Sequence, residues 1–226
     1  MCWNAIFRSL KEIVFPMCIV WLVAAVLVLA YYFVPGMAEA IEPVAQWQRD
    51  GGWVSALLNR LFFCGLLPGV FLLMRTNGRG RMTFAVIGVQ SVFAGFCGII
   101  CDWMYTLHAR LLGSGCDLGT VMLKTALCQF VWTPLLFVPM GAVVYFWIGR
   151  NLSFRRTREE WPCHFLSECY FPNLLANWVI WIPVGMMIHL FPTVLQIQLS
   201  GLASAVLSLA FIFLGRNIGR GKMFRR

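Results

Sequence analysis

Four ionisable side chains fall within long apolar stretches of the chain, where a charge is costly unless a partner or water compensates it. They are Arg60, Asp102, Lys124 and His189. Asp102 and Lys124 lie on consecutive apolar stretches joined by a short connection, so we expect them to form an ion pair. One interpretation is a polar vestibule that leads into a water-filled cavity. The other is that the long side chains reach a nearby membrane interface while Lys124 neutralises Asp102.

Nine cysteines are the other reactive groups. Their number is odd and most lie within or beside apolar stretches, where cysteine behaves as a small apolar residue, so no disulfide framework is expected. Cys97 and Cys101 share a helix face, and a second group consists of Cys163, His164 and Cys169. Neither spacing is a zinc signature, so we predict no metal site.

Motifs of familiar catalytic chemistry are missing from the sequence: it has no nucleophile elbow, phosphate-binding loop, paired catalytic carboxylates or His-Glu metalloprotease motif. An intramembrane enzyme that uses Cys97, Cys101 or His189 would require these groups to converge beside a hydrated pocket. Their linear spacing does not show such convergence. The sequence therefore predicts neither an enzyme nor a bound cofactor.

The composition places all of these residues in a membrane protein. Of the 226 residues, 60% are hydrophobic and only 12% are charged, and the mean hydropathy is +0.77. These values lie outside the globular range. The net charge of +9 is divided among short clusters between apolar runs, which argues against nucleic acid as a partner. We predict an all-α, polytopic transmembrane bundle in which residues 1–226 form a single membrane domain.

The apolar runs are long enough for six helices that cross about 30 Å of hydrocarbon. We expect residues 13–34 to form an extra, uncleaved N-terminal span and residues 54–216 to form the rest of the bundle. Residues 35–53 are expected to be a long connection, and residues 150–172 an amphipathic segment at the interface. Pro192 separates the last two spans. The six predicted spans are about 13–34, 54–74, 83–108, 120–149, 173–191 and 193–215.

The basic residues predict how the spans are oriented. Of the 18 Lys and Arg residues, fourteen fall on one side of the predicted membrane, two on the other and two within spans. Since short loops rich in Lys and Arg stay on the cytoplasmic or equivalent side, both termini are expected on one positively charged face. A basic tail of residues 217–226 is expected to touch anionic head groups, which makes membrane lipids a partner.

Prolines and small residues within the spans predict how the helices pack. Four prolines should kink their helices, which can open space inside a bundle. Pairs of small residues four positions apart, Ala94 with Gly98 and Gly201 with Ala205, predict close helix contacts. The four intramembrane prolines are Pro68, Pro134, Pro139 and Pro183.

The stretch 171–183 has the sequence FPNLLANWVIWIP, which combines prolines, an asparagine and tryptophans. It is the clearest similarity by which residues 82–216 resemble the family of small organellar membrane proteins named after Mpv-seventeen and the twenty-two-kilodalton peroxisomal membrane protein. Upstream, Lys124, Gln129, Thr133 and Pro134 resemble the family's Lys, Asp-Gln and Thr-Pro run, although Cys128 replaces the acid. The residues that carry the resemblance as candidate site positions are Trp103, Tyr105, Gln129, Pro134, Pro172, Asn177, Trp178, Trp181 and Pro183.

The resemblance implies a multi-pass protein of a bacterial inner membrane or of a mitochondrial inner or peroxisomal membrane, with pore-like passage of small metabolites or ions. We therefore expect a pore or channel for small solutes or ions, with Arg60, Asp102, Lys124 and His189 as vestibule residues. The alternative is a non-conducting scaffold that binds lipid or protein partners. Both hypotheses leave room for a homo-oligomer. A dry ion pair without a cavity would favour the scaffold.

Overall fold

The computed structural model describes residues 3–75, 81–163 and 165–214. Every regular element in this part of the chain is helical, and six helical stretches are long and apolar enough to cross a membrane. This confirms the predicted all-α fold and the number of spans. The six stretches are Val14–Phe33, Met37–Met74, Phe84–Leu112, Leu118–Gly149, Phe171–His189 and Thr193–Ala210.

The spans are built from long α-helices that are interrupted by short π-helical segments. The three π-helical segments of the described residues are labelled η1, η2 and η3. The elements are α1 (Trp3–Phe33), α2 (Met37–Arg60), η1 (Leu61–Leu66), α3 (Leu67–Arg75), α4 (Arg81–Leu112), α5 (Leu118–Leu127), η2 (Cys128–Phe137), α6 (Val138–Gly149), α7 (Phe154–Glu159), η3 (Leu166–Tyr170), α8 (Phe171–His189) and α9 (Thr193–Leu214).

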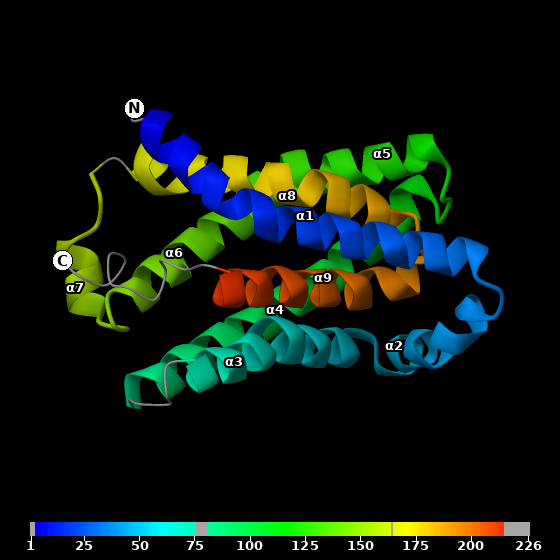
Figure 1. The fold of residues 1–226 in the computed structure, drawn as a ribbon, viewed down its shortest axis with the longest axis horizontal. Coiled ribbons are helices and arrows are strands. Elements are labelled where there is room, and N and C mark those ends of the chain that lie inside the picture. The colour runs from blue at the N-terminus through cyan, green and yellow to red at the C-terminus, as the bar shows by residue number, and fades with distance from the viewer. Residues whose placement is uncertain (1–2, 76–80, 164, 215–226) are drawn as a thin grey trace.

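Helix α9 occupies the middle of the bundle and packs against α1, α2, α3, α4 and α8 (Figure 1). The core around it contains Val20, Met104, Val184 and Ile197, all of which are buried. Helix α1 begins, and α9 ends, at the same end of the bundle. The predicted basic tail lies outside the described residues, as does His164, so the charge of the two faces stays a prediction.

The expectation that residues 35–53 form an extended connection was wrong. Helix α2 begins at Met37 and continues to Arg60, with one break at Gly52, whose φ of 49° and ψ of −128° are not helical. The polar first half satisfies itself within the helix: Gln46 Nε2 donates to Asp50 Oδ1 at 2.8 Å, and Arg49 pairs with Glu42. Side chains four residues apart that bond to each other stabilise a helix. The polar composition of this segment is therefore compatible with a helix as well as with a loop.

Glycines let α4 approach α2 and η1 closely, and let α9 approach α2. A Cβ atom at Gly98 of α4 would lie 2.5 Å from the carbonyl oxygen of Ala56, and one at Gly65 would lie 2.4 Å from Ser91 Cα. At Gly201 of α9 a Cβ would collide with the side chain of Asn59. The predicted close contacts at Gly98 and Gly201 are therefore present, and they hold α2 against both neighbours.

Pro134 lies within the π-helical segment η2, and Pro68 lies two residues after η1. Side chains of other helices donate the hydrogen bonds that these prolines, without an N–H, cannot donate. In η2 the bond from residue 134 to the Gln129 carbonyl cannot form because proline has no N–H. Trp178 Nε1 of α8 donates to that carbonyl instead, at 2.7 Å. Before Pro68, Gln90 Nε2 donates to the Cys64 carbonyl at 3.4 Å. These two hydrogen bonds thus join α4 to η1 and α8 to η2.

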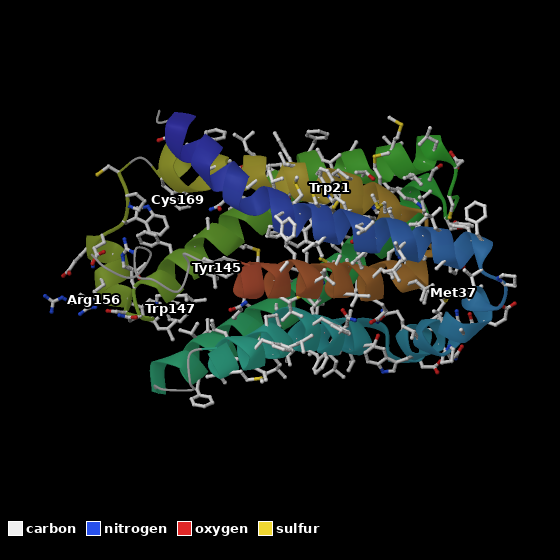
Figure 2. The ribbon with its side chains drawn as sticks, in the orientation of Figure 1. Trp21, Met37, Tyr145, Trp147, Arg156 and Cys169 are labelled. Atoms are coloured by element: carbon white, nitrogen blue, oxygen red, sulfur yellow. The ribbon has the colours of Figure 1, made fainter. Side chains whose placement is uncertain are left out.

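The predicted amphipathic segment of residues 150–172 consists of two short helical pieces, α7 and η3. Arg150 bonds to Glu160 at 2.5 Å, and Arg155 to Glu159 at 2.8 Å. Figure 2 shows Arg156 of α7 pointing away from the bundle. Helix α7 follows the end of α6, whereas η3 packs against α6 and continues into α8. The Tyr170 hydroxyl of η3 donates to the Pro134 carbonyl of η2 at 2.8 Å.

Candidate functional site

A cavity of about 320 Å³ lies among α2, η1, α4, η2, α6, α8 and α9. This volume is far above the roughly 10–15 Å³ that one buried water needs. The wall is a mixture of apolar groups and polar ones that can hold water or a solute. Its polar side chains, besides four cysteines, are Arg60, Gln90, Tyr105, Gln129, Thr133, Tyr145, Asn177, His189, Ser204 and Ser208.

Arg60 is the one charged side chain among the described residues that line the cavity. Its Nη2 atom donates to Ser200 Oγ at 2.9 Å, and its Nη1 atom donates to Ser204 Oγ at 3.1 Å. Its Nε atom is buried without a hydrogen-bond partner, and no carboxylate in the described part of the chain forms an ion pair with it. The charge is therefore held by neutral groups alone.

Four thiols line the cavity, and two of them contact this guanidinium. Arg60 Nη1 lies 3.7 Å from Cys64 Sγ, and Nη2 lies 3.6 Å from Cys101 Sγ. Cys97, one turn from Cys101 on α4, and Cys128 of η2 complete the set, and all four line the cavity. Within the described residues no group of three His, Cys, Asp or Glu side chains is placed to hold a metal ion. The thiols thus act as soft, neutral neighbours of the charge.

Helix α9 supplies the hydroxyl groups because it presents a polar residue at every fourth position. Gln196, Ser200, Ser204 and Ser208 lie along one side of the helix, which places about 18 Å between the first and the last. Ser204 and Ser208 line the cavity, and Ser200 binds Arg60. At the far end of the stripe Tyr145 of α6 lies near the end of α9 (Figure 2).

Two neighbouring histidines lie on α8 and α4, and one of them, His189, lines the cavity. His189 is 1% exposed, and its Nδ1 atom lies 3.3 Å from Gln196 Oε1. Its ring centre is 5.6 Å from that of Tyr105 and 6.1 Å from that of His108. His108 accepts a hydrogen bond on Nε2 from Trp132 Nε1 at 3.0 Å, so this ring is neutral and carries its proton on Nδ1. That Nδ1 atom is buried without a partner.

Lys124 of α5 is also buried, with 1% exposure. Its Nζ atom donates to the Gly115 carbonyl at 3.4 Å, which points the ammonium toward the connection between α4 and α5. The same connection ends in Asp117, whose carboxylate caps α5 by accepting from the Thr120 amide at 2.9 Å. That bond to the amide holds the pKa of Asp117 below its usual value.

The predicted ion pair between Asp102 and Lys124 is absent, and this expectation was wrong. Asp102 faces α2, where its Oδ1 atom accepts from Gln48 Nε2 at 2.9 Å. Gln48 belongs to a buried network in which Ser55 Oγ and Gln198 Nε2 each donate to its Oε1 atom at 2.6 Å. Asp102 therefore joins α4 to α2 and α9, and it does not line the cavity.

The predicted vestibule residues divide into two groups. Arg60 and His189 line the cavity, whereas Asp102 and Lys124 do not. Arg60 is bound to α9, so it does not extend to the interface as the snorkelling hypothesis required. Cys97, Cys101 and His189 do meet at one cavity, but no hydrogen bond in the described residues joins a thiol to the histidine, so a paired nucleophile and base is not formed.

The residues that carry the family resemblance serve both the cavity and its frame. Tyr105, Gln129, Asn177 and Trp181 line the cavity. Gln129 Nε2 donates to the Trp181 carbonyl at 3.4 Å, which links η2 to α8. The remaining five lie outside the wall and shape or brace the helices: Trp103, Pro134, Pro172, Trp178 and Pro183.

Sequence reasoning missed the hydroxyl stripe of α9, His108 and the polar residues Gln90 and Gln48. The four-residue spacing of Gln196, Ser200 and Ser204 was a signal that could have found the stripe. His108 stands at the edge of a predicted span and was a candidate by its type alone. No family, curated protein or solved structure matches the chain in sequence or fold comparisons.

Proposed function

We propose that the protein binds small polar solutes in this cavity and lets them cross the membrane, as a pore or channel. The observation that carries the proposal is an unpaired guanidinium, that of Arg60, on the wall of a 320 Å³ cavity inside an apolar bundle. A charge buried there without an acid would be strongly unfavourable in a dry bundle. Water or a bound solute in the cavity removes that cost.

The scaffold hypothesis draws no support from the arrangement of charges. A bundle that only presents a surface to lipids or proteins can neutralise its internal charges, and a pair between Asp102 and Lys124 would have been that case. Instead Asp102 bonds to an amide and Lys124 to a carbonyl. Other polar side chains of the bundle line the cavity, and a solute pathway requires such a polar lining.

The length of the cavity also supports a pathway. Gln90 near the start of α4 and Tyr105 near its end both line the wall, and fifteen residues of helix between them span about 22 Å. This is most of the roughly 30 Å thickness of the hydrocarbon. A route along this wall would then need to continue only through the remaining part of that thickness.

Filling the cavity tests the proposal. Gly141 of α6 lines it, and a Cβ atom there would meet only the Tyr145 ring, at 3.9 Å. We expect Gly141→Phe to place its ring in the cavity and to reduce conductance in planar bilayers severalfold. Gly88→Phe is the matched control, because a Cβ at Gly88 meets nothing within 4 Å and the residue is exposed on the outside of α4.

Two results would count against a pathway. If the folded wild-type protein, inserted in the bilayer, shows neither current nor solute flux, the scaffold becomes the better account. If Gly141→Phe and Gly88→Phe conduct equally, the cavity is not the route. The predicted relation to the Mpv-seventeen family agrees with a small-solute pathway and stays part of the same proposal.

A further inference from the structure

Basic side chains extend from the cavity to the connection between α4 and α5. Arg60 and His189 line the cavity, and the ring of His108 follows at 6.1 Å from that of His189. Lys124 of α5 lies at the connection itself: its side chain is buried, and its Nζ atom donates to the Gly115 carbonyl. These four residues, hereafter the basic route, come from four helices and belong to no shared sequence motif.

Within the described residues no carboxylate forms an ion pair with a side chain of this route. Asp102, on the same helix as His108, faces Gln48 of α2. Asp117, the acid nearest to Lys124 in sequence, caps α5 at the surface, and its charge acts on that of Lys124 from there. Arg60 is thus the basic group without an acid near it, and a cavity wall with such a charge attracts anions and repels cations.

The contacts of Arg60 leave it ready to bind an anion. Its two terminal nitrogen atoms bond to hydroxyl and thiol groups, which are neutral acceptors, and Nε has no partner. Ser208 can turn its hydroxyl hydrogen toward a bound oxygen or halide, whereas the Ser204 hydroxyl donates to the Ser200 carbonyl at 2.8 Å. Gln129 and Asn177 contribute amide donors to the same wall. A bound anion would compensate the one charge of the cavity and accept from several donors at once.

We propose that the cavity is a site for small anions, held by Arg60, and that Lys124, His108 and His189 guide them there from the connection between α4 and α5. The ligand class is a small monovalent anion such as a halide or a short carboxylate. This inference rests on the proposed function, since it names the solute of the same cavity. A neutral solute would not require the charge of Arg60, and a cation would be opposed by it.

The reversal potential of the bilayer current under a potassium chloride gradient tests the inference. The wild-type protein should prefer chloride over potassium, and Arg60→Gln should lower that permeability ratio by about tenfold, since one charge near the ion is removed. Arg60→Lys, which keeps the charge, should retain most of the preference. Arg156→Gln, which removes an exposed charge of α7 on the outside of the bundle, is the control and should leave the ratio unchanged.

Lys124→Gln gives a second readout that does not depend on how Arg60 variants fold. Since Lys124 acts before the cavity, its loss should lower chloride current at low salt more than at high salt. Flux of neutral glycerol into proteoliposomes separates the two proposals. Glycerol flux together with a potassium preference, or an unchanged ratio in Arg60→Gln, overturns the anion site alone. A protein that passes neither chloride nor glycerol overturns the pathway as well.

Discussion

The close contact of α4 with α2 gives a quantitative prediction for Gly98. A Cβ atom at this position would lie 2.5 Å from the Ala56 carbonyl oxygen and 2.9 Å from both Cβ and Cγ of Arg60. The obstacle is backbone together with the stem of the side chain on the cavity wall, so α2 must move. Overpacking of this kind costs about 1–3 kcal/mol. We expect Gly98→Ala to destabilise the bundle by that amount and to displace Arg60.

Two other glycines of α4 provide the controls. At Gly88 a Cβ meets nothing within 4 Å, and at Gly95 the nearest atoms, of Leu57 and Leu61, lie at 3.5 Å, an ordinary contact. Each substitution removes one helical glycine, so the difference between Gly98→Ala and Gly88→Ala cancels the helix propensity. That difference should be about 1–3 kcal/mol, and Gly95→Ala should resemble Gly88→Ala.

The assay is reversible unfolding in mixed micelles, followed by the fluorescence of the ten tryptophans. Bilayer conductance of the same variants reports on Arg60. Equal stability of Gly98→Ala and Gly88→Ala, within about 0.5 kcal/mol, would show that α2 and α4 do not approach as closely as described. A destabilised Gly98→Ala variant with unchanged conductance would separate the helix contact from the position of Arg60.

Two further predictions concern single hydrogen bonds. Trp178→Phe keeps a ring at the site but leaves the Gln129 carbonyl without its donor, so it should cost about 1–3 kcal/mol in the same unfolding assay; a neutral result would mean that another group satisfies this carbonyl. Because the pKa of Asp117 is lowered by its capping bond, its contribution to stability should be present above the ordinary pKa of about 3.9 and be lost as the pH falls through the lower, folded value. The melting temperature of wild type relative to Asp117→Ala should thus converge in acid, and a difference that is independent of pH would contradict the cap.

The spans were predictable because each depends on one property, the apolar length of a segment. The break at Pro192 is a good example: α8 ends at His189 and α9 begins at Thr193, as a proline between two full-length runs predicts. Residues 37–51 were not predictable in this way. The charged residues of this segment are typical of a loop, but their side chains bond to one another within the helix. Composition alone does not show which side chains bond to each other.

The predicted ion pair between Asp102 and Lys124 is absent because of the way α4 is rotated about its axis. Asp102 and His108 are six residues apart, which places them about 120° apart around the axis of α4. Asp102 consequently faces α2, while His108 faces η2 and α8. The predicted order of the spans identifies which helices follow one another, but which side of a helix meets which neighbour depends on the tertiary contacts. The glycines that seat α4 against α2 fix that rotation.

Arg60 was found from the sequence because a charge in an apolar run is conspicuous, whereas its partners were not. Serines are ordinary in membrane helices, and only the packing of α9 against α2 turns Ser200 and Ser204 toward the guanidinium. The cavity itself is lined by residues of seven elements. No single segment of sequence encodes it, although the regular spacing of polar residues on α9 points to its length.

The central claim is that water and small solutes reach a cavity inside the bundle, and the reactivity of Cys97 tests it most directly. In a variant whose only cysteine is Cys97, on the cavity wall, a small charged methanethiosulfonate should react at least about tenfold faster than with Leu135→Cys in a cysteine-free background. Leu135 lies in η2 and is 74% exposed on the outside of the bundle, where lipid surrounds it. Thiolates form only where water solvates them. Fast labelling of Cys97 alone would support the hydrated cavity; equally slow labelling of both positions would contradict it.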